Sequence, residues 1–355
     1  MVATIKRAYF HIAGETIAPG TSEKIEIPVS ELSAGMLAKL EARVFHGRNQ
    51  GPVIFVSAAI HGDEIIGTEI IRRLMQRLRP ARMAGTVIFV PVVNMFGFIA
   101  QSRYLPDRRD LNRSFPGSER GSLASQLANI FYTEIVTKCS IGIDIHSAAI
   151  NRYNLPQIRI AAGYPALKEL AIAFGAPVVI EAPLRDGSLR EIAKRDGVEM
   201  LLLEAGEALR FDESDIIIGV DGVLRVMRAL NMIGAARPSA KRAGKQTGVP
   251  AQASNTRWLR AAQGGVCRLI AKSGDRVRSG DTVAIICDIF GQDEELIISP
   301  CDGIIIGHAT LPIVNQGDAI LHIAQIAVPN EATPNEGSTA KLGLNGVMLD
   351  EDEVL

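Results

Sequence analysis

Four side chains in this sequence are of types that bind metal ions or move protons, and they lie at or shortly after the ends of apolar runs. His61 and Glu64 are three residues apart in the segment His-Gly-Asp-Glu, and His146 and Glu204 end two further runs. Two imidazoles and one carboxylate around an open coordination position form a zinc site that is typical of hydrolases. The alternative for His146 is a histidine at a strand end whose hydrogen bonds are only structural. The placement of His61, Glu64 and His146 together at strand ends favours a metal site.

Glu204 follows four apolar residues and precedes Ala-Gly-Glu. A carboxylate at the end of a buried strand is unfavourable unless it is paired or takes part in chemistry. Its structural alternatives are a salt bridge and a helix cap. Its functional role would be that of a general base for metal-activated water, with Glu207 as the nearest rival.

A loop between these segments is rich in arginine and is bounded by proline and glycine. Four arginines lie within eleven residues of it: Arg103, Arg108, Arg109 and Arg113. The pair Asn112 and Arg113 offers an amide and a planar guanidinium, which together suit a carboxylate. A solvated surface loop is the alternative interpretation.

The elements that must position these residues alternate between strand and helix. The expected order is strand 52–60, helix 65–78, strand 86–93, helix 121–138, strand 141–145, helix 166–174, strand 177–180, helix 189–196, strand 200–203 and helix 215–232. Such alternation predicts a doubly wound α/β domain. Ligands bind at the carboxyl ends of the strands in such sheets, so we expect the four side chains to converge there.

The composition changes along the chain and predicts two domains. Residues 1–236 are expected to form an α/β domain that carries the candidate catalytic residues, and the basic segment 237–250, rich in Pro, Gly and Ser, is expected to be a linker. Residues 251–325 contain recurring Gly-Asp turns and are expected to form a small all-β domain. The segment 326–355 ends in an acidic run and is expected to be a disordered tail.

The overall composition excludes several classes of protein. The 355 residues are 47% hydrophobic with a net charge of −1, which indicates a globular chain with no surface suited to nucleic acid or an anionic membrane. No apolar run reaches the length of about 18 residues that a membrane-spanning helix needs. The four cysteines form no CxxC pair, so a reducing cytoplasm is the expected location.

Four motifs in this order resemble the succinylglutamate desuccinylase/aspartoacylase family, a branch of the zinc carboxypeptidase-like amidohydrolases. They are His61-Gly-Asp-Glu64, Asp110-Leu-Asn-Arg-Ser-Phe-Pro116, Asp144-Ile-His146 and Glu204-Ala-Gly206. The resemblance covers roughly residues 45–325. It implies a zinc carboxypeptidase-like catalytic domain followed by a barrel-sandwich-like all-β domain.

The resemblance also implies roles for individual residues. His61, Glu64 and His146 would bind one zinc ion per chain, and Glu204 would be the general base. Asp144 lies two residues from His146 on the same strand face and is a candidate to orient its ring.

The same comparison implies that Asn112 and Arg113 hold a substrate carboxylate. Arg103 is the best match for an arginine that stabilises the oxyanion. The gap between Arg103 and the Asp-Leu-Asn-Arg motif is longer than expected for aspartoacylases, so Arg108 and Arg109 stay open as alternatives for this role.

The expected activity is zinc-dependent hydrolysis of the amide bond of a small N-acylated amino acid or related amine. A metallocarboxypeptidase that acts on peptide C-termini and a non-catalytic zinc-binding protein stay open as alternatives. The expected partner is a small-molecule N-acyl substrate, with neither nucleic acid nor membrane. The sequence leaves the acyl group, the amine and homo-oligomer formation open.

Overall fold

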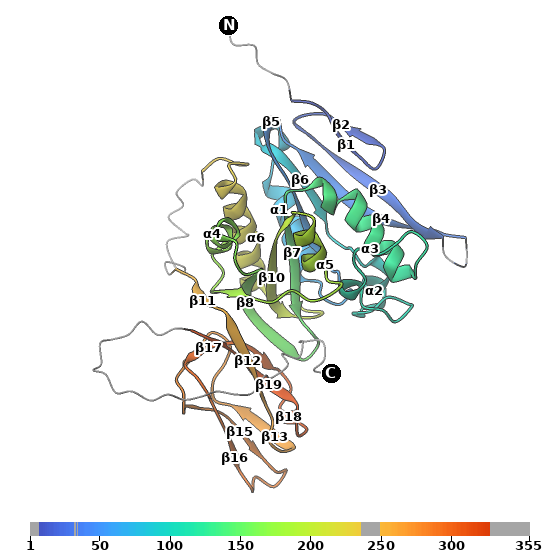
Figure 1. Cartoon of the computed structure of the whole chain (residues 1–355). Coiled ribbons are helices and arrows are strands. Elements are labelled where there is room, and N and C mark those ends of the chain that lie inside the picture. The colour runs from blue at the N-terminus through green and yellow to red at the C-terminus, as the bar shows by residue number, and fades with distance from the viewer. Residues whose placement is uncertain (1–6, 32, 34, 236–248, 327–355) are drawn as a thin grey trace. The chain divides into compact units, whose positions relative to one another are not determined.

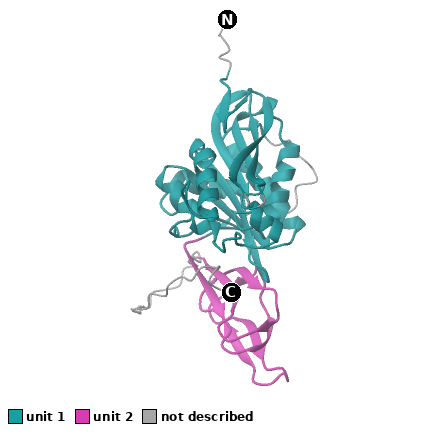
Figure 2. Ribbon diagram, turned by 90° about the vertical axis from the view of Figure 1, so that its right-hand side faces the viewer, with its two compact units in different colours: residues 1–252 teal, residues 253–355 magenta. Residues whose placement is uncertain are grey.

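The computed structural model describes residues 7–31, 33, 35–235 and 249–326 (Figure 1). The chain divides into two compact units, residues 1–252 and 253–355 (Figure 2). Each unit has a hydrophobic core of its own. Except for residues 249, 250 and 326, the expected linker and acidic tail lie outside the described residues.

One large mixed sheet organises the first unit, in the order β9-β8-β10-β7-β5-β6-β4-β3. Its strands are β3 (Thr21–Glu31), β4 (Leu37–His46), β5 (Asn49–Ala58), β6 (Ala84–Val90), β7 (Ile141–Ala148), β8 (Arg152–Ile160), β9 (Val178–Glu181) and β10 (Glu199–Glu207). Strands β10, β7, β5 and β6 are parallel, whereas β8 runs antiparallel to β10 and β4 antiparallel to β6. A separate hairpin contains β1 (Phe10–Ile12) and β2 (Glu15–Ile17).

Helices cover both faces of this sheet (Figure 1). One core contains residues of α1 (Ile66–Arg77), α4 (Pro165–Phe174) and α6 (Glu213–Ala229). The other core involves α2 (Met95–Ala100), α3 (Leu123–Glu134) and α5 (Leu189–Arg195). Short 3₁₀ helices occupy Pro80–Arg82, Leu111–Arg113 and Val136–Lys138.

One face of strand β7 packs into a hydrophobic core, and the opposite face carries candidate functional residues. All eight of its residues are buried, because both faces of the strand are covered. Ile141, Ile143 and Ile145 belong to the core beneath α1 and α6. Successive side chains of a strand point to opposite faces, so Asp144 and His146 lie on the other face.

Most predicted elements of the first unit are confirmed, but β8 was missed. The predicted helices at 65–78, 166–174 and 215–232 correspond to α1, α4 and α6. Strand β8 carries Asn154, Pro156 and Gln157 in buried positions, where a sequence pattern is expected to show apolar residues. Proline inside a run also argues against a strand. The mixed α/β class and the separate all-β unit agree with the predicted fold.

The second unit is built from two antiparallel sheets around one core. The first contains β12 (Asn255–Arg260), β19 (Ala319–Gln325), β17 (Gly303–Ala309) and β14 (Arg276–Val277). The second contains β16 (Glu295–Ile298), β15 (Thr282–Cys287), β13 (Gly265–Leu269) and β18 (Ile313–Val314). A short strand, β11 (Ala251–Ala253), spans the boundary between the units.

The recurring Gly-Asp pairs of the second unit form turns with the same backbone conformation and the same hydrogen bond. Each glycine has a positive φ, which is +98°, +93° and +93° at Gly274, Gly280 and Gly317. Each following aspartate accepts a hydrogen bond from the backbone N–H three residues before it, at 3.0, 2.7 and 2.7 Å. The left-handed backbone explains why glycine occupies these positions.

Among the described residues, no helix is both long enough and apolar enough to cross a membrane.

Gly142 in the centre of β7 provides a test of the packing. A Cβ at this position would overlap the ring of Phe55 and the sulfur of Met200. We therefore expect Gly142→Ala to lower the free energy of unfolding by about 1–3 kcal/mol, as overpacked cores do. Gly234→Ala is the control, because no atom of the described residues lies within 4 Å of its Cβ position. Urea unfolding measures both variants, and equal midpoints would contradict the packing described for β7.

Candidate metal centre

The structure brings together the three residues that the sequence predicts as metal ligands. His61 and Glu64 lie in the turn between β5 and α1, and His146 lies near the end of β7. All three side chains are buried, and one ligand atom from each lies within 4.8 Å of the others. These three side chains therefore lie together at the carboxyl ends of the strands, as the sequence predicts.

The ligand atoms face one another directly. Oε1 of Glu64 lies 2.7 Å from Nδ1 of His61, and Oε2 lies 2.7 Å from Nδ1 of His146. The two imidazole rings are 5.1 Å apart between centroids. Both histidines thus present the same ring nitrogen, Nδ1, to the common centre.

The other nitrogen of each ring contacts a second carboxylate. Nε2 of His61 lies 3.2 Å from Oδ1 of Asp110, and Nε2 of His146 lies 2.8 Å from Oδ2 of Asp144. Asp144 also accepts a hydrogen bond of 2.7 Å from the hydroxyl of Ser57. A carboxylate that holds the Nε2 proton orients the ring and leaves Nδ1 as the ligand atom. The expected contact between Asp144 and His146 is confirmed.

This donor set fits a zinc ion. Two imidazole nitrogens and a carboxylate oxygen are ligands that zinc accepts, and three protein ligands leave a coordination position open for water or substrate. Carboxylates behind both histidines are a recurring feature of such sites.

Gly62 lets the loop of the metal centre pack closely on α2. A Cβ on Gly62 would overlap the backbone of Gly97, so a larger residue does not fit. Asn94 fixes the start of α2, since its side chain accepts a hydrogen bond of 2.9 Å from the N–H of Gly97. The amide of Asn94 also donates to the carbonyl of Arg103 at 3.3 Å, which ties the arginine loop to the same helix.

Arg103, Arg108 and Arg109 were the candidates to stabilise the oxyanion, and Arg103 contacts the metal centre. It donates to Oε1 of Glu64 at 3.2 Å and to Oδ2 of Asp110 at 2.9 Å. Its side chain is 10% exposed, whereas that of Arg109 is 64% exposed. Arg108 is also an exposed residue. This burial and these contacts favour Arg103 over Arg108 and Arg109 as the candidate for the oxyanion role.

Glu204 is buried beside the metal centre. In the sheet it pairs with His146 of β7 on one side and with Gln157 of β8 on the other. Its rival Glu207 is half-buried and accepts a hydrogen bond of 3.0 Å from the backbone N–H of Asn151. This contact gives Glu207 a structural role in the turn between β7 and β8.

Asn112 and Arg113 follow Asp110 in a short 3₁₀ helix. The N–H of Asn112 donates to Oδ1 of Asp110 at 2.7 Å, so the loop is tied to the carboxylate that contacts His61. The side-chain oxygen of Asn112 accepts a bond of 3.0 Å from the N–H of Leu189, at the start of α5. Arg113 is exposed, and its guanidinium donates to the carbonyl of Asn112 at 2.9 Å.

The sequence patterns did not single out three polar residues on the Glu204 side of the sheet. Gln157 has no exposed surface, and neither polar atom of its amide has a hydrogen-bond partner. Arg159 lies two residues further along β8, on the same face. Burial and, to a lesser extent, the nearby charge of Arg159 lower the pKa of Arg190 in α5 to about 10, while the charge of Glu204 opposes the shift. Recognition of β8 as a strand would have placed Gln157 and Arg159 beside Glu204.

The buried charged groups of the metal centre strongly shift one another's pKa values. Burial by itself lowers the pKa of His61, but Glu64 and Asp110 outweigh it and raise the pKa to about 9. Burial likewise opposes the charged form of His146, and the carboxylates of Asp144 and Glu64 raise its pKa well above the usual value. Burial alone would raise the pKa of Glu64, but the two imidazoles hold it well below its usual range.

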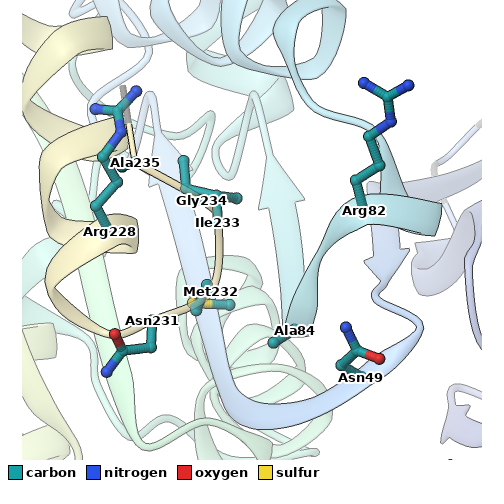
Figure 3. Close-up of a pocket in the computed structure, with 9 residues that line it drawn as sticks. All are labelled: Asn49, Arg82, Ala84, Arg228, Asn231, Met232, Ile233, Gly234 and Ala235. Carbon is teal, nitrogen blue, oxygen red and sulfur yellow. The ribbon is translucent and has the colours of Figure 1, made fainter. Parts of the chain in front are cut away.

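A separate pocket lies at the opposite edge of the sheet (Figure 3). Its volume is about 620 Å³, and its lining includes Asn49 and Ala84, the first residues of β5 and β6. Figure 3 shows the side chains of Arg82 and Arg228 on opposite sides of it. Its lining, as far as the structure describes it, contains neither histidine nor carboxylate, so these residues do not supply the chemistry of the metal centre.

Residues 50–230 match the family model described as the succinylglutamate desuccinylase/aspartoacylase catalytic domain. The chain is 25% identical to an N-alpha-acetyl-L-2,4-diaminobutyric acid deacetylase of Halomonas elongata over 315 residues, which cover 85% of this chain and 90% of that protein.

Solved structures extend this likeness to most of the chain. A succinylglutamate desuccinylase/aspartoacylase from Rhodobacter sphaeroides is 27% identical with a TM-score of 0.74, and the match covers 86% of this chain and 96% of that one. A product-bound ectoine utilization protein EutE (DoeB) from Ruegeria pomeroyi shares the fold, with a TM-score of 0.73 at 20% identity over 86% of this chain and 95% of that one.

Substitution of a ligand should remove the metal. We expect His61→Ala and His146→Ala to abolish stoichiometric zinc binding, because each leaves two ligands from the group. His11→Ala, in the hairpin of β1 and β2, is the control and should keep one zinc per chain. Elemental analysis after gel filtration measures the content, and full occupancy in both ligand variants would show that the ligands are placed wrongly.

Zinc binding should also release protons. The raised pKa values of His61 and His146 mean that both rings are protonated at pH 7 when no ion is bound. Zinc must displace the Nδ1 protons, so we expect release of about two protons per ion at pH 7. The apparent affinity should then rise as the pH rises toward about 9, the pKa of His61.

Calorimetric titration in buffers of different ionisation enthalpy measures this release. Binding that neither releases protons nor varies in affinity with pH would contradict the charge arrangement.

Proposed function

This chain belongs to the succinylglutamate desuccinylase/aspartoacylase family, and we propose that it is a zinc-dependent deacylase that hydrolyses the amide bond of a small N-acylated amino acid or related amine. The observation that carries this proposal is the buried group of His61, Glu64 and His146, with Glu204 opposite His146 in the sheet. The likeness to a deacetylase of N-alpha-acetyl-L-2,4-diaminobutyric acid supports the same class of reaction.

In this proposal His61, Glu64 and His146 hold one zinc ion per chain. When bound, zinc supplies Lewis-acid chemistry, which polarises an amide carbonyl and makes water more acidic. Asp110 and Asp144 keep the Nε2 protons in place, so the two rings do not rotate away from the centre.

Glu204 accepts the proton of the attacking water and returns it to the leaving amine. Its burial supports this role, because a carboxylate that is removed from bulk solvent and close to the reacting atoms is an effective general base. Arg103 supplies positive charge for the developing oxyanion from its position beside Glu64. An arginine donor in a buried site is worth more than one in water.

Positive charge also surrounds the expected position of the amine half of the substrate. Asn112 and Arg113 present a pair that suits a carboxylate. Arg159 lies in β8, on the side of Glu204 away from β7, and the charge of Arg190 acts on both Glu204 and Asp144. We propose that the substrate carries at least one carboxylate on its amine half.

We further propose that the enzyme works in a reducing compartment such as the cytoplasm. Cys139, Cys267, Cys287 and Cys301 are free thiols in the structure. Free thiols are the usual state of cysteine where glutathione and thioredoxin act.

The activity is tested with the zinc-loaded full chain. The substrates are N-alpha-acetyl-L-2,4-diaminobutyrate, N-acetyl-L-aspartate, N-succinyl-L-glutamate, an N-formyl amino acid and an unblocked tripeptide. We expect release of a free carboxylic acid from at least one acyl amino acid and no cleavage of the tripeptide. Cleavage of the tripeptide alone would identify a carboxypeptidase, and no turnover by fully loaded protein would favour a non-catalytic zinc protein.

Glu204→Gln should abolish most of the activity and keep the metal. Glutamine retains the shape of the side chain but does not accept a proton, so kcat should fall by about 10²–10⁴-fold. Glu207→Gln is the matched control from the same strand, and we expect its kcat to stay within about threefold of the wild type, because glutamine keeps a side-chain oxygen that accepts the hydrogen bond from the N–H of Asn151. Near-normal kcat in Glu204→Gln would remove the general-base role from this residue.

A further inference from the structure

The beginning of β8 carries a buried amide next to the proposed general base. Asn154 is 1% exposed, and its Nδ2 donates a hydrogen bond of 3.1 Å to Oε2 of Glu204. Nothing in the roles assigned above uses this residue. The donor must be the NH₂ group, because an ionised carboxylate only accepts.

The sheet is irregular at this point. Asn154 pairs with Gly206, and the register of β10 shifts between Glu204 and Gly206 against β8. The register also shifts after Glu204 against β7. Gly206 has a φ of +77°, a left-handed conformation that glycine adopts without strain. Such irregularities redirect the neighbouring side chain, so the regular ladder does not by itself set the direction of Glu204.

A second contact fixes the position of Asn154. The hydroxyl of its neighbour Tyr153 donates to Oδ1 of Asp215 at 3.2 Å, and Asp215 is a buried residue of the first turn of α6. Oδ2 of Asp215 lies 3.3 Å from the position that a Cβ on Gly206 would take. The start of β8, the irregular part of β10 and the first turn of α6 therefore meet around the residue that contacts Glu204.

A general base needs a defined direction as well as a charge. A carboxylate rotates about its last carbon–carbon bond, and a hydrogen bond to one oxygen fixes the plane and hence the direction of the other. Hydrogen bonds to an ionised group are the stronger ones. An amide is suited to this task, because it donates to the carboxylate without competing for the proton.

We infer that Asn154 is a positioning residue that holds the carboxylate of Glu204 in the orientation in which it accepts the proton of water. The inference rests on the proposed function, because it requires Glu204 to be the general base. In this role Asn154 acts through Glu204.

Two substitutions remove the donor in different ways. Asn154→Leu keeps the branching and the number of side-chain heavy atoms, and Asn154→Asp keeps the shape but places a like charge beside Glu204. We expect kcat of Asn154→Leu to fall about 10–100-fold, with KM and zinc content unchanged, as for loss of a hydrogen bond to a charged group. The loss in Asn154→Asp should be at least as large, because two adjacent carboxylates repel each other.

A double-mutant cycle separates positioning from a purely structural effect. In the Glu204→Gln background the base is absent, so Asn154→Leu should lower kcat by less than about threefold. A structural role would lower kcat by the same factor in both backgrounds. The assay uses whichever acyl amino acid of the panel gives the highest kcat/KM, and circular dichroism and zinc content verify folding. If Asn154→Leu does not fold, the same cycle is run with Asn154→Ala.

The outcomes distinguish this inference from the proposed function. If Glu204→Gln alone is fully active, the general-base role fails and the inference fails with it. If Glu204→Gln is inactive while Asn154→Leu keeps kcat within about twofold of the wild type, only the positioning inference is overturned. An undiminished effect of Asn154→Leu in the Glu204→Gln background also overturns it.

Discussion

The carboxylate of Glu64 lies between the rings of His61 and His146, with one oxygen 2.7 Å from Nδ1 of each. Burial opposes the charged form of all three groups, yet each is held in that form by its neighbours. Such an arrangement is stable only while positive and negative charges stay matched within a few ångströms. A divalent cation satisfies the same condition with the two rings neutral, which explains why the site suits a metal.

The sheet supplies the rigidity that this charge arrangement needs. Strands β5, β7 and β10 are parallel neighbours, so the residues at their carboxyl ends meet at one edge. The alternation along β7 places Ile143 and Ile145 in one core and Asp144 and His146 on the opposite face. Ser57 of β5 then contacts Asp144 across the sheet. The carboxylate behind His146 is therefore held by strands, whereas Asp110, behind His61, lies in the loop at the start of the 3₁₀ helix Leu111–Arg113.

The sequence predicted the metal group and Glu204 because their residue types stand out at the ends of apolar runs. Asp144 followed from the period of the strand. Arg103 could not be separated from Arg108 and Arg109, because burial in a loop has no periodic signal. Strand β8 was missed because two polar residues and a proline occupy buried positions in it, and Asn154, Gln157 and Arg159 were missed with it. Polar residues inside a sheet are buried at a cost, so they occur where function needs them and where hydrophobic patterns fail.

The function proposed for this chain depends on zinc being held by two imidazoles and one carboxylate. X-ray absorption spectroscopy at the zinc edge of the loaded full chain tests this ligand set directly. We expect a first shell of nitrogen and oxygen at about 2.0–2.2 Å, with the outer-shell scattering of two imidazole rings. A sulfur scatterer at about 2.3 Å, or a shell without imidazole, would show that zinc binds elsewhere and would contradict this ligand set.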